Sequence, residues 1–375
     1  MFFTVVFSIY FLINAYIFVR GWQAVPSASA WRLAYVVVFL FFFSAFILGR
    51  VIERGRISLA SEALIWVGAF WLAAMLYFVL VCAALDLARL VNHFIPFFPK
   101  AVTADYGRAK VITFVVSIAA VALLVLGGHI NTLFIRTRTL NLDIPKGVSG
   151  PKTLNIVLAS DIHLGSIVGA SRLRSIVDRI NSLHPDLVIL DGDVVDEDLT
   201  SVIGRNVGDA LSDIRAPLGV IAVTGNHEYF GGIVPAVKYL TTHNVRLLRD
   251  EVMTIRDDVY IVGREDTHHS GTARKPLSEL MARVDKRFPV IVLDHQPRNL
   301  AEAASLGADV ELCGHTHNGQ LWPWNLLVLS FYDVKYGYRR VGNMHVYVTS
   351  GAGTWGPPVR IGTHPEVVDI ILHFR

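Results

Sequence analysis

Five short apolar runs in the second half of the chain each lead into residues that can bind a metal ion. The runs are "LNIVLAS", "DLVIL", "LGVIAVT", "PVIVLD" and "ADVELC". The groups that follow them are Asp161-Ile162-His163, Asp191-Gly192-Asp193, Gly225-Asn226-His227-Glu228, His295, and Gly314-His315-Thr316-His317. In an open α/β sheet, ligands bind just beyond the carboxyl ends of the strands. Each group alone is typical of a solvated turn, but five in succession predict one shared site.

The residue types at this site indicate two divalent ions. A carboxylate can bridge two ions held about 3.5–4 Å apart, and a mixed set of nitrogen and oxygen donors favours Mn, Fe, Zn, Co or Ni over Mg or Ca. The thiolates of a structural zinc site are missing, so Cys313 is expected to be a small buried residue. Two such ions generate hydroxide at neutral pH and stabilise charge on phosphoryl oxygens. The expected reaction is attack of a metal-bridging hydroxide on phosphorus.

Short apolar runs and helical stretches alternate around these groups. "RTRTLNLDIP" alternates polar and apolar residues as a half-buried strand does, and "DIPKGVSGPK" is typical of a turn. Ala170–Leu183 and Val234–Asn244 have helical patterns between the apolar runs. This alternation predicts a layered α/β domain over residues 136–375.

The first 135 residues are rich in long apolar stretches, which account for the chain's hydrophobic fraction of 53% and its mean hydropathy of +0.47. Four stretches lack Asp, Glu, Lys and Arg: Phe2–Val19, Leu33–Gly49, Ala63–Leu85 and Val111–Ile135. About 20 helical residues cross a bilayer core of roughly 30 Å. We therefore expect residues 1–135 to form a bundle of four transmembrane helices. The first charge, Arg20, follows the first stretch, which argues against a cleaved signal peptide.

Charge and cysteine content exclude several classes of protein. The 34 Lys and Arg residues nearly balance the 31 Asp and Glu residues, and without a basic run no nucleic-acid partner is expected. Cys82 and Cys313 cannot form a disulfide framework. His129 is the only ionisable residue inside the four stretches, which argues against a transporter with a charged path. Basic residues on the two sides do not decide the orientation. We expect a multi-pass protein of the cell membrane, with the cytoplasm preferred for the catalytic domain.

The series D-x-H, G-D, G-N-H-E, a lone His and G-H-T-H resembles the calcineurin-like metallophosphoesterases. The resemblance covers roughly Leu154 to Phe374 and includes the membrane-attached branch, with its "GHTHGGQ" and late "GTWGPP-R" elements. This chain reads "GHTHNGQ", with Asn318 in place of a glycine, which touches no ligand position. The resemblance implies an α/β fold with a two-sheet β-sandwich flanked by helices.

Residue by residue, the resemblance implies two ions that share Asp193. One ion would be held by Asp161, His163, Asp193 and His317, and the other by Asp193, Asn226, His295 and His315. His227 would protonate the leaving oxygen or hold the phosphate, and Glu228 would orient His227 or remain a solvated acid. Arg360 is a candidate phosphate clamp because a guanidinium binds phosphate bidentately, or else a surface residue. Asn226 is the other candidate substrate contact.

The expected function is hydrolysis of a phosphoester or phosphoanhydride by a membrane-anchored enzyme, with a lipid-linked phosphate as one candidate substrate. Two alternatives stay open: a non-catalytic phosphate-binding or scaffold module on a membrane anchor, and a phosphodiesterase for soluble nucleotides. Trp355 is expected either to line the site or to pack. Gly263–Gly271 is either a substrate loop or, like His268 and His269 within it, a solvent-exposed segment. The oligomeric state stays open.

Overall fold

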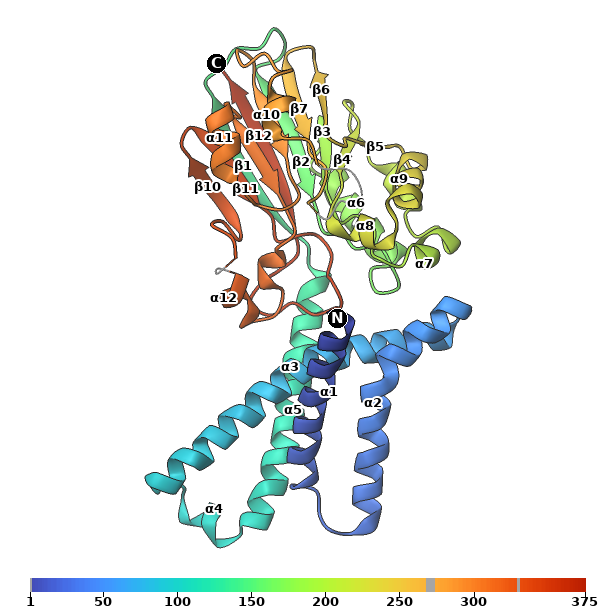
Figure 1. Cartoon of the computed structure of the whole chain (residues 1–375), viewed down its shortest axis with the longest axis vertical. Coiled ribbons are helices and arrows are strands. Elements are labelled where there is room, and N and C mark those ends of the chain that lie inside the picture. Colours follow the sequence, from blue (N-terminus) through green and yellow to red (C-terminus); the bar gives the residue numbers. More distant parts are fainter. Residues whose placement is uncertain (1, 268–273, 329–330) are drawn as a thin grey trace. The chain divides into compact units, whose positions relative to one another are not determined.

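The computed structural model describes residues 2–267, 274–328 and 331–375. It divides into two compact units, Met1–Ile130 and Asn131–Arg375 (Figure 1). The substrate-loop prediction for Gly263–Gly271 falls partly outside the described residues, and its two histidines lie wholly outside them.

The first unit consists of helices, as predicted. They are α1 (Phe2–Trp22), α2 (Ser29–Gly55), α3 (Leu59–Phe94), α4 (Lys100–Ala104) and α5 (Tyr106–Leu133). All but α4 are long and apolar enough to cross a membrane. The segment "NHFIPFFPKA" leaves α3, and its last residues begin the short helix α4.

Aromatic packing and a few polar contacts hold these helices together. Trp71 of α3 makes an edge contact with Phe39 of α2, with ring centroids 5.4 Å apart. The Trp71 indole donates a hydrogen bond to the side-chain oxygen of Asn14 in α1, at 3.0 Å. Such hydrogen bonds between helices are favourable in a bilayer, where water is missing as a partner.

The second unit contains two six-stranded sheets, as the predicted fold requires. One sheet has the order β1-β12-β2-β3-β4-β5 and the other β10-β11-β9-β8-β7-β6. The strands of the first sheet are β1 (Arg136–Ile144), β2 (Thr153–Ala159), β3 (Leu187–Asp191), β4 (Val220–Val223), β5 (Val245–Leu247) and β12 (Glu366–Phe374). Those of the second are β6 (Glu251–Ile255), β7 (Val259–Gly263), β8 (Val290–Leu293), β9 (Val310–Cys313), β10 (Gly337–Val341) and β11 (Met344–Val348).

Helices of this unit lie between the strands in sequence. They are α6 (Ala170–Asn181), α7 (Leu199–Gly204), α8 (Asn226–Gly231), α9 (Ile233–Thr242), α10 (Leu277–Met281), α11 (Leu300–Leu306) and α12 (Trp324–Val328), with 3₁₀ turns at Asp209–Asp213 and His317–Gly319. In α6 the buried residues follow a helical period: Leu173, Ile176, Val177 and Ile180. Both predicted helical stretches are confirmed, each ending two residues before its expected end.

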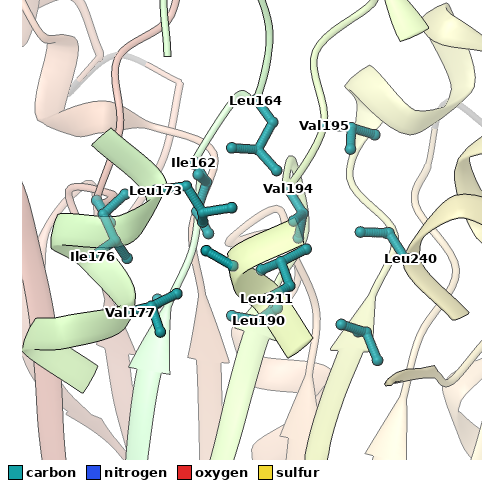
Figure 2. Close-up of a cluster of buried hydrophobic side chains, with 14 of the residues drawn as sticks. Ile162, Leu164, Leu173, Ile176, Val177, Leu190, Val194, Val195, Leu211 and Leu240 are labelled. Carbon is teal, nitrogen blue, oxygen red and sulfur yellow. The ribbon is translucent and has the colours of Figure 1, made fainter. Parts of the chain in front are cut away.

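Three apolar layers account for the sandwich. The middle layer joins residues of both sheets, such as Ile156 and Ile189 from one and Ile261 and Leu312 from the other. An outer layer covers the first sheet with α6 and α9, and part of it is seen in Figure 2. The other outer layer packs α10 and α11 on the second sheet. The order of layers is therefore helix, sheet, sheet, helix.

Strand direction brings the predicted groups to one edge. β2, β3 and β4 pair in parallel, so their carboxyl ends lie together. β8 and β9 also pair in parallel, so the residues after them meet at one edge of the second sheet. The loops from the two sheets interlock, since the His315 amide donates to the Asp161 carboxylate at 2.9 Å.

Candidate dinuclear metal centre

The loops after β2, β3 and β9 carry a backbone conformation that side-chain-bearing residues rarely adopt. Asp161, His163, Asp193, His315 and His317 all have φ between 48° and 69°. A non-glycine residue in this left-handed region costs free energy, and such residues cluster at functional sites. The fold therefore holds five of the seven predicted ligands in strained positions at one place.

Six of the predicted ligands gather in three groups whose candidate ligand atoms lie within 4.8 Å of one another. The groups are Asp161, His163 and His317; His163, Asp193 and His227; and Asp193, His295 and His315. Asp193 Oδ2 lies 3.0 Å from His295 Nε2 and 3.8 Å from His163 Nε2. One carboxylate thus stands between the ligand groups expected for two ions.

The seventh predicted ligand, Asn226, has a buried side-chain oxygen that is available to bind a cation. Its Oδ1 atom accepts no hydrogen bond from the residues that the structure describes. A buried oxygen without a partner costs roughly 1–3 kcal/mol, and a cation would satisfy it. His295 is also oriented to bind a metal ion. Its Nδ1 donates to the Asp191 carbonyl at 2.7 Å, which leaves Nε2 available as a ligand atom.

The donor set fits two divalent ions. The three groups found among the described residues contain only imidazole nitrogens and carboxylate oxygens, which suits first-row transition ions. Cys313 is fully buried within an apolar layer, as predicted. Burial raises the pKa of its thiol well above the usual value, which keeps it protonated.

Glu228 supports the site through the backbone. Its fully buried carboxylate accepts hydrogen bonds from the backbone N–H groups of Asp193, Val194, Val195 and Gly225, at 2.7 to 3.1 Å. The carboxylate thereby ties the loop after β3 to the first turn of α8. These contacts support a role in holding the Asp193 loop, whereas the prediction was that Glu228 orients His227 or remains a solvated acid. The burial of Glu228 does not fit a solvated acid.

His227 lies beside the ligand groups and is oriented by a residue that we did not predict. Its Nδ1 atom is 2.9 Å from Oδ1 of Asp196, and its backbone N–H donates to Asp193 Oδ1 at 2.9 Å. Burial alone would lower the pKa of His227, but the hydrogen bond to Asp196 and the charge of Asp193 raise it to about 9. Burial alone would raise the pKa of Asp196, but its interactions with His163 and His227 hold this pKa below its usual range.

Arg360 is fully buried, unlike a surface arginine. Its guanidinium donates to the carbonyls of Ser350 at 2.7 Å and Gly353 at 2.8 Å. It also lies 3.2 Å from His317 Nδ1, and burial lowers its pKa to about 10. These contacts support a role in positioning His317 and the late "GTWGPP" loop. The phosphate-clamp role stays a prediction.

Two exposed aromatic side chains flank His227. The rings of Phe230 and Trp355 have centroids 5.4 Å and 5.7 Å from that of His227, and both residues are 56% exposed. Two hydrogen bonds to the Gln320 side chain hold the backbone of Trp355 in place. The Trp355 N–H donates to Oε1 and the Trp355 carbonyl accepts from Nε2, each at 2.9 Å. The apolar surface beside His227 is therefore open to a bound molecule.

Comparison with known proteins agrees with the geometry. Residues 154–319 match the model of the calcineurin-like phosphoesterase family. An uncharacterized metallophosphoesterase of Helicobacter pylori is 34% identical over 231 residues, which is 59% of this chain and 60% of that protein. A transmembrane protein with metallophosphoesterase domain from Danio rerio is 31% identical, over 61% of this chain and 54% of its own length. This chain thus matches little more than half the length of either relative.

Among solved structures, the chain is similar to the 5'-nucleotidase precursor from Thermus thermophilus. It is 17% identical, with a TM-score of 0.34, and the similarity covers 59% of this chain and 54% of that one.

Proposed function

Because the chain is a calcineurin-like metallophosphoesterase with four candidate membrane-spanning helices, we propose that it is a membrane-anchored phosphoesterase with two metal ions. It hydrolyses a phosphoester or phosphoanhydride. The observation that carries this proposal is the place of Asp193 Oδ2 between His295 and His163.

Each ion has its own set of ligands in this proposal. Asp161, His163 and His317 hold one ion, and Asn226, His295 and His315 hold the other, while Asp193 contributes to both. When bound, the ions activate water and neutralise phosphoryl oxygens. The protein keeps Asp193 in place through Glu228, and keeps His295 in the required tautomer through the Asp191 carbonyl.

His227 acts on the leaving group. Asp196 occupies its Nδ1 atom, so the free Nε2 atom is the one that can meet substrate. A proton held there is transferred to the departing oxygen, a step that contributes typically 10²–10⁴-fold to the rate.

Activity of the purified full chain tests the proposal. Hydrolysis of p-nitrophenyl phosphate and of its bis ester is measured in detergent, after chelation and after addition of Mn, Zn, Fe, Co or Ni. We expect activity to vanish with chelator and return with metal. Asp161→Asn should abolish it, and His93→Ala, at an exposed position in α3, should not. A chain that binds metal and phosphate without turnover of either ester would instead be a binding module.

The substrate that the site surroundings favour is a lipid-linked phosphate or diphosphate. The exposed rings of Phe230 and Trp355 beside His227 offer apolar contact to a group attached near the phosphate. A membrane anchor brings such a substrate close to the site.

Matched substrates distinguish the lipid from the soluble alternative. The full chain in nanodiscs is given a long-chain lipid phosphate and a water-soluble ester with the same head. We expect Phe230→Ser and Trp355→Ser to raise KM for the lipid several-fold and to leave KM for the water-soluble ester unchanged. Faster cleavage of the soluble ester than of any lipid phosphate would contradict the lipid assignment alone.

The proposed location is the cell membrane, with the catalytic unit in the cytoplasm. Cys82 and Cys313 are both free thiols, as is usual in a reducing compartment. The test is a single thiol at the exposed position Ser175 of α6, introduced into a chain with Cys82 replaced by Ser. We expect an impermeant maleimide to label it only after the cells are lysed.

A further inference from the structure

The helical unit contains a cavity of its own, with a volume of about 520 Å³, lined by residues of α1, α2, α3 and α5. Along α3 the lining extends from Phe70 to Arg89, and along α5 from Lys110 to Leu126. At 1.5 Å per helical residue these stretches are roughly 28 Å and 24 Å long. The cavity is therefore long and narrow, and nearly matches the roughly 30 Å core of a bilayer.

Most of the cavity wall is apolar. Phe39, Trp71 and Phe78 form an aromatic side, in which the rings of Trp71 and Phe78 lie 5.9 Å apart. Val121 and Val125 of α5 contribute an aliphatic side. A wall of this kind suits a hydrocarbon chain and is unfavourable for a hydrated solute.

One end of the cavity carries charge. Asp86 accepts from Arg20 at 2.7 Å and from Arg89 at 3.3 Å, and the Tyr16 hydroxyl donates to the same carboxylate at 2.6 Å. Lys110 also lines this end, and it forms no ion pair with any residue that the structure describes. Three cations and one anion thus line this end of the cavity, which leaves a formal excess of two positive charges.

The charged end lies at the C-terminal ends of α1 and α3 and the N-terminal end of α5. The chain enters the catalytic unit from the other end of α5, after Leu133. If α5 spans the bilayer, the charged end belongs to the opposite membrane face from the point where the chain leaves α5.

We infer that this cavity binds one membrane phospholipid with an anionic headgroup. An acyl chain occupies the aromatic and aliphatic interior, and the headgroup phosphate lies against Arg89 and Lys110. The apolar length selects an amphiphile over a soluble anion. The excess positive charge selects an anionic headgroup, such as that of phosphatidylglycerol, over a zwitterionic one. This site is independent of the proposed hydrolysis.

Native mass spectrometry of the full chain in detergent tests the inference. The protein is titrated with phosphatidylglycerol and with phosphatidylcholine of identical acyl chains. We expect one bound phosphatidylglycerol per chain, held more tightly than phosphatidylcholine. Loss of a cation near the headgroup should weaken binding about fivefold, so the double substitution Arg89→Gln/Lys110→Gln should weaken it about 25-fold. Arg108→Gln is the control, because Arg108 is an exposed cation near the start of α5 that does not line the cavity.

A second variant covers the case in which the double substitution fails to fold. Ala74→Phe narrows the apolar part and leaves the four charged residues intact, so it should reduce retention of both lipids. Equal affinity for the two lipids, or unchanged binding in both variants, would overturn the inference. Spectra that show paired chains without lipid would overturn it in favour of a second copy. Because the readout is mass, failure here leaves the phosphoesterase proposal untouched.

Discussion

The carboxylate of Asp196 lies 2.9 Å from Nδ1 of His227 and 3.8 Å from Nδ1 of His163. An Asp carboxylate that contacts one ring nitrogen fixes the tautomer and orientation of the other. The side chain of Asp196 is 16% exposed, and it acts through its hydrogen bond to the imidazole of His227. It is a positioning residue in the proposed reaction.

Replacing Asp196 by Asn should slow turnover and retain the metals. The amide cannot stabilise a protonated His227 as the carboxylate does, so we expect kcat to fall on the order of 10–100-fold, within what proton transfer contributes. The fall should be steepest for substrates with a basic leaving group, and KM should change little. Glu197→Gln, at the exposed neighbouring position, is the control. A loss of metal in the Asp196→Asn protein would show that Asp196 supports the ligands instead.

The His227→Ala variant separates proton transfer from phosphate binding. Both metal ions should remain, because the ring of His227 faces Asp196 and is not needed as a ligand. Turnover of alkyl phosphates should drop about 10²–10⁴-fold. Turnover of p-nitrophenyl phosphate should drop less, because nitrophenolate departs without a proton. Equal losses for both substrates with intact metal content would assign His227 to phosphate binding.

Most residues of the candidate site could be predicted from the sequence because they stand at the carboxyl ends of strands. Asp161, Asp193, His295 and the pair His315 and His317 follow apolar runs directly, and parallel pairing of those runs brings the ends together. The residue types at the ends then define the chemistry. Fold class and candidate ligands follow from one pattern.

Residues away from the strand ends were harder to interpret, for a physical reason. Asp196 lies three residues past Asp193 in an irregular loop, where no hydrophobic period indicates which way a side chain points. The carboxylate of Glu228 accepts four backbone N–H groups, and backbone partners leave no trace in side-chain types. The burial of Arg360 depends on how the late loop folds around it. "VVDED" after "DGD" was the available signal for Asp196.

Metal content should distinguish Asp193→Ala from Asn226→Ala. Asp193 Oδ2 faces both ligand groups, so its removal should cost both ions. Asn226 contributes one neutral oxygen, so its removal should weaken chiefly one. Elemental analysis of the purified variants after dialysis measures the equivalents bound per chain. Two full equivalents in the Asp193→Ala protein would exclude the shared-ligand assignment.

The buried carboxyl of Glu311 should make the stability of the catalytic unit depend on pH. It lies within β9, is 2% exposed, and its Oε2 atom has no hydrogen-bond partner among the residues that the structure describes. Burial, together with the nearby charge of Asp294, raises the pKa of this carboxyl well above its usual value, although Arg264 opposes the shift. The folded state therefore binds the Glu311 proton more tightly than the unfolded state does.

The sign of the effect follows from this difference in proton binding. A raised pKa in the folded state contributes stability that is complete below the unfolded value, about 4.3. That contribution is lost as pH rises through the folded value, by at most about 1.4 kcal/mol per pH unit. Glu311→Gln keeps the shape of the side chain and removes the titration. We expect its unfolding midpoint to exceed that of the unsubstituted protein by a margin that grows with pH.

Calorimetry of the full chain in detergent between pH 5 and 9 measures this margin. Glu251→Gln, at an exposed position in β6, should show a margin that stays near zero and does not vary with pH. A constant offset between the Glu311→Gln and unsubstituted proteins would mean that Glu311 is ionised in the folded state across the whole range. In that case the charges of Arg264 and Arg274 would outweigh burial, and the variant should be the less stable protein throughout.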